Sequence, residues 1–159
     1  MIELELPYPP SLNRYLKNWR GRMVKSQIAK DYQTVIKLRA KNHLEEKKLD
    51  LKPISEKIAV HLTLHAKDRR QMDLDNAKKV VLDALQTVIY DNDRQIDWEF
   101  TERGKITPKG ENGKLVVRIY EHDEIINLQN QIKSQNKQAD TLTQKECWLL
   151  ALNMDNKNE

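Results

Sequence analysis

The stretch EKIAVHLTLHAKDRRQMDLDNAKKVVLDAL, residues 56–85, holds the two patterns that decide the fold. Through residues 58–65 apolar and polar side chains alternate, which predicts a strand with one face on the core. Apolar side chains then recur at the spacing of one helix face: Ala77, Val80, Val81, Ala84, Leu85 and Val88. Asp75 or Asn76 is suited to cap this helix. We therefore expect a strand, a polar loop and an amphipathic helix.

The flanking sequence predicts the remaining elements of an α+β domain over residues 1–121. Strand patterns cover residues 1–6, 96–103 and 114–122, and Trp98 is expected in the core on the face of Ile96 and Phe100. Residues 12–26 read as a basic loop or irregular arm broken at Gly21. Ser26 is a suitable N-cap for a helix to about residue 47. Its expected apolar stripe is Ile28, Tyr32, Val35, Ile36, Leu38 and Leu44. The order β-α-β-α-β-β favours a compact mixed β-sheet with two packed helices.

Composition changes after residue 121, where Asn, Gln and Lys become frequent. A heptad-like seam follows, made of Ile125, Leu128, Ile132, Ala139 and Leu142, and Thr143 to Glu146 reads as a capping box. We expect residues 122–159 to form a helical C-terminal extension that packs on a partner subunit. A partly disordered tail and an arm that recruits another protein remain the alternatives.

Charge and cysteine content limit the function classes. The chain has 159 residues, a net charge of +4 and one cysteine, so it forms no internal disulfide. It shows no signal segment and no run of transmembrane length, and we expect a cytoplasmic, soluble protein without a membrane partner. Residues 14–48 carry 11 Lys and Arg against three acids. This cationic segment favours nucleic acid as the partner, with a solvated helix face as the alternative.

Two aspartates one residue apart, Asp73 and Asp75, are the strongest candidates for chemistry. In extended chain they face the same side, where both carboxylates can bind one hard cation. Asp93 is the favoured third ligand, with Asp91 in reserve, on the expectation that the turn after the helix returns near the first strand's exit. Three carboxylates suit Mg²⁺ or Mn²⁺, whereas a zinc ligand set and an EF-hand pattern are lacking. The alternative is that these acids only cap a helix.

Basic residues surround this acidic pair. Lys79 falls one helical turn after Asp75, where it can pair with Asp83 or neutralise charge on a scissile phosphate. Arg69 and Arg70 are placed to hold flanking phosphates.

Two separated segments resemble the RusA family of Holliday-junction resolvases. The core segment is RRQMDLDNAKKVVLDAL, residues 69–85, followed by YDNDRQI, residues 90–96. The opening LPYPPSLNRYLKNWRGR, residues 6–22, is similar to the family's N-terminal signature. The resemblance covers roughly residues 1–120. Met72 stands where family members can carry a basic residue, and Asn92 where they can carry a second aspartate.

The resemblance implies a small homodimeric, Mg²⁺-dependent endonuclease that cuts four-way DNA junctions in recombination and repair, often prophage-encoded. Its catalytic acids match Asp73, Asp75 and Asp93, its helical lysine matches Lys79, and Asn76 closes the D-x-D-N motif. The expected DNA-binding residues are Arg14, Lys17, Arg20, Arg22, Arg69, Arg70, Asn76 and Lys79.

The hypothesis is phosphodiester hydrolysis by paired symmetric cuts, because a two-fold dimer presents two sites to a two-fold junction. Tyr15 or Trp19 would grip the branch point, unless these rings pack in the core. The alternatives are a non-catalytic protein selective for branched DNA, and a nuclease for flaps, forks or RNA.

Overall fold

A computed structural model describes residues 1–69, 73–124, 126–127 and 130. The elements are β1 (Ile2–Pro7), α1 (Leu12–Tyr15), β2 (Leu16–Trp19), β3 (Arg22–Lys25), α2 (Gln27–Glu46), β4 (Ile58–His65), α3 (Leu74–Leu85), the 3-10 helix η1 (Asp93–Gln95), β5 (Ile96–Arg103) and β6 (Lys114–Glu121). Strands β1, β4, β5 and β6 and helices α2 and α3 appear in the predicted order, which confirms the α+β class.

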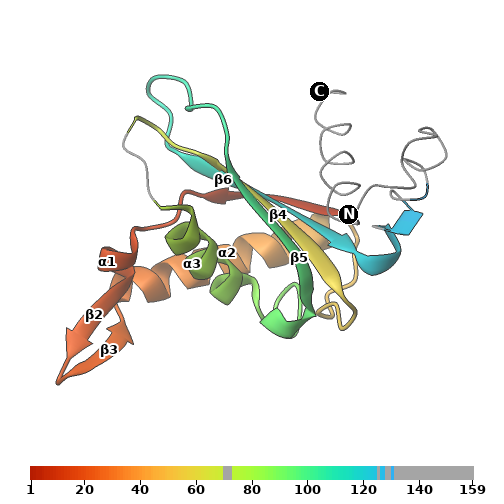
Figure 1. The fold of residues 1–159 in the computed structure, drawn as a ribbon, viewed down its shortest axis with the longest axis horizontal. Helices are drawn as coiled ribbons and strands as arrows, with labels where there is room; N and C mark the ends of the chain where they lie inside the picture. The colour runs from red at the N-terminus through yellow and green to blue at the C-terminus, as the bar shows by residue number, and fades with distance from the viewer. Residues whose placement is uncertain (70–72, 125, 128–129, 131–159) are drawn as a thin grey trace, which may run out of the picture.

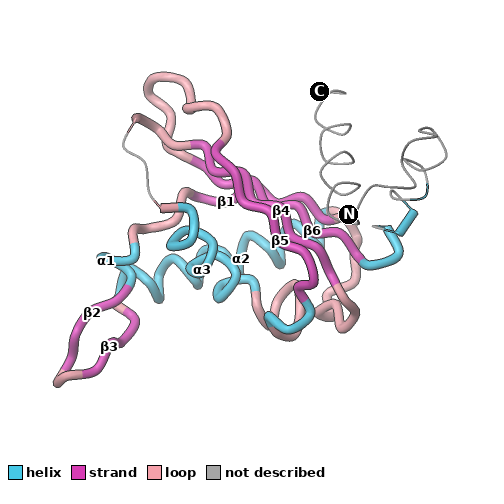
Figure 2. Tube along the Cα trace, viewed as in Figure 1, coloured by secondary structure: helices cyan, strands magenta, loops and turns pink. Residues whose placement is uncertain are grey.

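Four strands form the main sheet in the order β1-β6-β4-β5. Strand β6 is antiparallel to β1 and β4, whereas β4 and β5 are parallel and are joined through α3. Helices α2 and α3 lie beside each other against one face of the sheet (Figure 1; Figure 2). The face of β4 made by Ile58, Val60, Leu62 and Leu64 is buried beneath them, as the alternation predicts.

Helix α2 begins where the sequence predicts but buries a shifted stripe. The Ser26 side chain accepts a hydrogen bond from the Ala29 backbone N–H and caps the helix. Its buried residues are Ala29, Tyr32, Ile36, Ala40 and Leu44. The prediction was wrong for three large apolar residues that are exposed instead, namely Ile28, Val35 and Leu38. Two of the buried residues are alanines, whose small side chains allow close approach of neighbouring elements.

Helix α3 begins earlier and ends earlier than predicted. Its N-cap is Asp73, not Asp75 or Asn76, and its last residue is Leu85. The predicted apolar stripe from Ala77 to Leu85 is buried. Val88 is also buried, but it lies in the turn that follows the helix.

Strand β5 contains an irregularity that separates two of its apolar residues. Ile58 pairs with Ile96, but the next residue of β4, Ala59, pairs with Trp98. The extra residue behaves as a β-bulge and turns Trp98 to the other face of the sheet. Ile96 packs on the main core, whereas Trp98 and Phe100 pack on a second cluster with Ala59 and Tyr120. The prediction of one shared face was therefore wrong.

Residues 12–25 form a short helix and a hairpin, not the predicted irregular arm. Strands β2 and β3 are joined by Arg20 and Gly21, whose φ angles of 50° and 78° match a two-residue hairpin turn. The Gly21 backbone N–H also donates to Asn18 Oδ1 at 3.0 Å. The hairpin projects from the rest of the described chain (Figure 1). The prediction of an irregular arm missed that Arg20 and Gly21 form a two-residue turn, which reverses the chain into a hairpin.

The predicted C-terminal extension lies mostly outside the described residues, so its helical structure and its role stay predictions. Among the helices that the structure describes, none is both long enough and apolar enough to span a bilayer.

Candidate functional site

The first turn of α3 carries Asp73 and Asp75. The Asp73 side chain makes no hydrogen bond that caps the helix, and among the described residues its Oδ2 accepts a long 3.5 Å bond from Asn76 Nδ2. The Asp75 side chain is 94% exposed. Asp75 lies within the helix, so the expectation that both acids share an extended segment was wrong. The two carboxylates nevertheless lie within one turn, beside backbone N–H groups that favour anions.

Lys78 connects this turn to the sheet, which the sequence reading did not anticipate. Its Nζ lies 3.0 Å from Glu99 Oε1 on β5 and 3.8 Å from Asp75 Oδ1. The hydrogen bond to Glu99, more than any other contact, raises the pKa of Lys78 above its ordinary value. Lys78 therefore stays charged and holds the start of α3 against β5. The spacing of Asp75 and Lys78, three residues apart on a helix, was the available signal.

Asp93 begins η1, at the turn between α3 and β5. The Asn92 side chain and Gln95 form a reciprocal capping box around this turn. The Tyr90 hydroxyl donates to the Leu82 carbonyl at 2.8 Å and lies 3.4 Å from Asp93 Oδ1. Burial, assisted by the Asp93 charge, raises the pKa of Tyr90. Asp93 is therefore held beside the C-terminal half of α3.

One chain does not bring all three acids together. The parallel pairing of Ile58 with Ile96 puts the start of β5, and Asp93 just before it, at the edge where β4 begins. Asp73 instead follows the edge where β4 ends, and Asp75 and Leu82 are separated by roughly 10 Å along α3 at 1.5 Å per residue. Within the described ranges, no group of three or more acidic, histidine or cysteine side chains could hold a metal ion. The expected return of this turn to the strand's exit was wrong.

The donor chemistry nevertheless fits Mg²⁺ or Mn²⁺, which prefer carboxylate oxygens. Asp73 and Asp75 are exposed, and among the described residues their side chains make only the long bond from Asn76 and the 3.8 Å contact with Lys78, so both are accessible to a cation. Asp91, the reserve ligand, is exposed in the same turn as Asp93, and its backbone carbonyl accepts from Gln86.

The basic residues near the acids are exposed. Lys79 does not pair with Asp83, whose Oδ2 lies 3.5 Å from Lys25 Nζ. In the part of the chain that the structure describes, no ion pair includes Lys79 or Arg69. Both are therefore available to an anionic ligand. Arg70 lies outside the described residues.

The other predicted DNA-binding residues lie together in α1 and the hairpin. Arg14, Lys17, Arg20 and Arg22 are all exposed, and among the described ion pairs none includes them. Trp19 is 59% exposed, whereas Tyr15 is 2% exposed and packs in the core. Burial raises the pKa of the Tyr15 hydroxyl to about 12. Trp19 is therefore available for stacking on a base, and Tyr15 is not.

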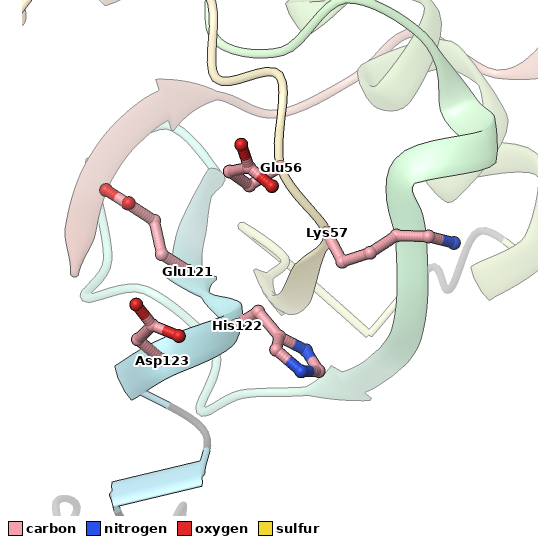
Figure 3. Close-up of a pocket in the computed structure, with 5 residues that line it drawn as sticks. All are labelled: Glu56, Lys57, Glu121, His122 and Asp123. Atoms are coloured by element: carbon pink, nitrogen blue, oxygen red, sulfur yellow. The ribbon is translucent and has the colours of Figure 1, made fainter.

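A separate hollow lies at the end of β6, lined by Glu56, Lys57, Glu121, His122 and Asp123 (Figure 3). Lys57 extends away from the acids in this view, and its Nζ bonds Asp97 Oδ1 at 2.6 Å and the Arg94 carbonyl at 3.1 Å. The three acids are therefore not balanced by this lysine. They also form no metal-binding group among the described residues, so the hollow is not a candidate for the metal site.

Comparison with known proteins identifies the family. Residues 7–120 match the family model described as Endodeoxyribonuclease RusA. The chain is 30% identical over 120 residues to the crossover junction endodeoxyribonuclease RusA of Escherichia coli strain K12, covering 74% of this chain and 92% of that protein. The corresponding proteins of Shigella sonnei and Enterobacteria phage 82 are 30% and 29% identical over the same coverage. The chain therefore belongs to the RusA family of endodeoxyribonucleases.

Proposed function

We propose that this protein is a Mg²⁺-dependent endonuclease that resolves four-way DNA junctions by paired symmetric cuts. The relatives named crossover junction endodeoxyribonucleases support the substrate. The observation that carries the chemistry is the exposure of Asp73 and Asp75 at the start of α3, where the Asp73 side chain makes no capping bond. An N-cap aspartate that makes no capping bond leaves its carboxylate available to a ligand.

In the proposed hydrolysis, different residues bind the cation, stabilise charge on the phosphate and position the DNA. Asp73 and Asp75 hold the cation, with Mn²⁺ as a substitute for Mg²⁺. When bound, a divalent cation supplies Lewis acidity and lowers the pKa of water for in-line attack on the phosphodiester. The exposed ammonium of Lys79 neutralises charge that develops on the scissile phosphate. Arg69, Arg70 and Asn76, together with the cations of the hairpin, position the DNA backbone.

A homodimer supplies the third carboxylate that one chain does not place beside Asp73 and Asp75. Because Asp93 lies beside the far half of α3, we propose that each Asp73–Asp75 pair is completed by Asp93 of the partner subunit. Two-fold symmetry then creates two equivalent sites, which matches the two-fold symmetry of a four-way junction. Paired cuts follow from this arrangement.

The main rival is a protein that binds branched DNA without cutting it, with the aspartates acting as helix caps. The missing capping bond at Asp73 argues against that role. A nuclease for flaps, forks or RNA uses the same acids and differs only in substrate.

The test is cleavage of a synthetic four-way junction by the wild-type protein with Mg²⁺ and with EDTA. Duplex, flap, fork and RNA substrates are compared at one salt concentration, because electrostatic binding imitates preference. Paired symmetric nicks in the junction, with Mg²⁺ only, are expected. Binding without cleavage in both Mg²⁺ and Mn²⁺ would support the rival.

Subunit mixing tests the shared site. Chains carrying Asp73→Asn plus Asp75→Asn are combined with chains carrying Asp93→Asn, neither of which cuts alone. If Asp93 acts across the dimer, one site of each mixed dimer is intact and single nicks return. If all three acids act within one chain, both sites of the mixed dimer stay defective and no nick appears.

A further inference from the structure

The hairpin of β2 and β3 carries a hollow on one of its faces. The hollow has a volume of about 330 Å³ and is lined by Lys17, Trp19, Val24, Lys25, Gln27 and Lys30. Lys17 is opposite Val24 and Trp19 is opposite Arg22 in the strand register, so these four side chains share a face. The volume is at the lower end of the range for small-ligand clefts. It suits a group the size of one nucleotide.

The lining matches the two parts of a nucleotide. The indole of Trp19 and the side chain of Val24 offer flat and apolar surface to a base. Lys17, Lys25 and Lys30 also line the hollow, and the positive charge of Lys17 and Lys30 suits a phosphate, whereas the Lys25 ammonium lies 3.5 Å from Asp83 Oδ2. Only Lys25 among these three has a described ion pair, with Asp83. The hollow therefore combines an aromatic surface with excess positive charge, as sites for unpaired nucleotides do.

The hairpin is fixed at its base by contacts with the rest of the fold. Ser26 Oγ donates to the Arg14 carbonyl at 2.6 Å, and the Ser26 backbone N–H donates to the Tyr15 carbonyl at 2.9 Å. Tyr15 is buried in the core, and its hydroxyl accepts from Gln33 Nε2. The Lys25–Asp83 pair joins the hairpin to α3, the helix that carries Asp73 and Asp75. A hairpin anchored in this way loses less backbone freedom on binding than a free loop would.

We propose that this hollow binds one unpaired nucleotide of branched DNA, with its base stacked on Trp19 and its phosphate held by Lys17 and Lys30. The choice of branched DNA rests on the proposed function, whereas the nucleotide site rests on the hairpin alone. A continuous duplex keeps its bases stacked inside the helix and offers none to Trp19. The hairpin therefore distinguishes a branch point from intact duplex.

Two cations lie near the indole in the unbound protein. Lys17 Nζ and the Arg20 guanidinium are 5.8 and 5.7 Å from the ring centre. An exposed cation–π contact corresponds to about a 2- to 5-fold effect on an equilibrium constant, whereas base stacking on an aromatic side chain corresponds to about 5- to 150-fold. A base therefore displaces one cation from the ring. The displaced side chain remains close enough to contact the phosphate.

The test is a binding assay in EDTA, so that cleavage does not enter the readout. Wild type, Trp19→Ala, Trp19→Phe and Met23→Ala are compared on a four-way junction, a single-stranded oligonucleotide and a duplex. Met23 is the matched control because it is 63% exposed on the same hairpin but does not line the hollow. Trp19→Ala should weaken binding to the junction and the single strand by about 5- to 150-fold. Duplex binding should change less than about 2-fold, and Trp19→Phe should recover much of the loss.

Other results would overturn the site. Equal losses on all three DNAs would make Trp19 part of a general backbone contact, and a Trp19→Ala protein that behaves like Met23→Ala would remove its role. Failure of the proposed function looks different. In that case wild type binds the single strand through Trp19 in EDTA but does not cut a junction when Mg²⁺ is added.

Discussion

The two long helices begin with residues of the same kind, and the two residues behave differently. Ser26 precedes α2 and accepts the Ala29 backbone N–H at 3.2 Å. Asp73 precedes α3 in similarly extended backbone, with ψ of 130°, but makes no capping bond. Both residue types are good N-caps, so sequence alone assigns both the same role. The difference indicates that Ser26 stabilises the fold, while the Asp73 carboxylate is left available for a ligand.

The largest effect is expected from Asp75→Asn. Loss of one charged ligand should lower junction cleavage by about 10³-fold, because the cation is held less tightly and transition-state charge is less stabilised. Single-turnover cleavage at saturating protein measures this. The matched control is Asp83→Asn on the same helix, which removes a partly exposed ion pair with Lys25 and should leave the rate within a few-fold. Equal losses in both variants would indicate damage to α3 instead of a ligand role.

Lys79→Ala should produce the next largest effect. Removal of one group that stabilises charge in the transition state costs about 10²-fold in rate, while affinity for the junction changes little. Lys79→Arg should recover part of the rate. Cleavage and binding are measured on the same preparations. A loss confined to affinity would assign Lys79 to the DNA backbone and remove it from catalysis.

Ser26→Ala tests the other half of the comparison. Loss of this cap should lower the free energy of unfolding by about 1 kcal/mol, which corresponds to a fall in Tm of about 3–5 °C for a domain of this size. Thermal unfolding followed by circular dichroism measures the change. Cleavage at 25 °C should persist, since most molecules remain folded. An unchanged Tm would mean that the hydrogen bond to Ala29 contributes nothing.

The smallest effect concerns pH and a histidine that is buried in the sheet. His61 is 1% exposed, and its Nε2 lies 2.9 Å from Glu102 Oε1. Burial lowers the pKa of His61, although Glu102 opposes the shift. The unfolded chain therefore binds a proton more readily, and the free energy of unfolding should fall as pH drops from about 6.5 toward the lowered pKa.

Thermal unfolding of wild type and His61→Gln at pH 7.5 and 5.5 measures this contribution. Wild type should lose more stability than the variant on acidification. An equal or smaller loss in wild type would show that Glu102 outweighs burial and keeps the imidazole charged.

The regular elements were predictable because their patterns are local. Alternation in β1, β4 and β6 and the stripe of α3 follow directly from the period of side-chain burial. The bulge that turns Trp98 away from Ile96 depends on pairing with β4, which no local pattern encodes. The exposure of the Ile28 and Leu38 side chains likewise depends on which elements pack against α2.

The residues of the candidate site also differ in whether a local pattern could predict them. Asp73, Asp75 and Lys79 were found from spacing within one segment. The position of Asp93 depended on strand direction, because a parallel β4–α3–β5 unit returns to the edge where β4 starts. The ion pair of Lys78 with Glu99 depended on the same tertiary packing.

The most direct test of the account is Asp73→Ala, which removes both the metal-binding carboxylate and any capping oxygen, with folding, junction binding and cleavage measured on one preparation. The account predicts a Tm within about 1 °C of wild type, since no capping bond is lost, together with retained binding and no Mg²⁺-dependent nicks. A Tm lowered by about 3–5 °C, as expected for the loss of a cap worth about 1 kcal/mol, with cleavage intact would contradict it and return Asp73 to helix capping.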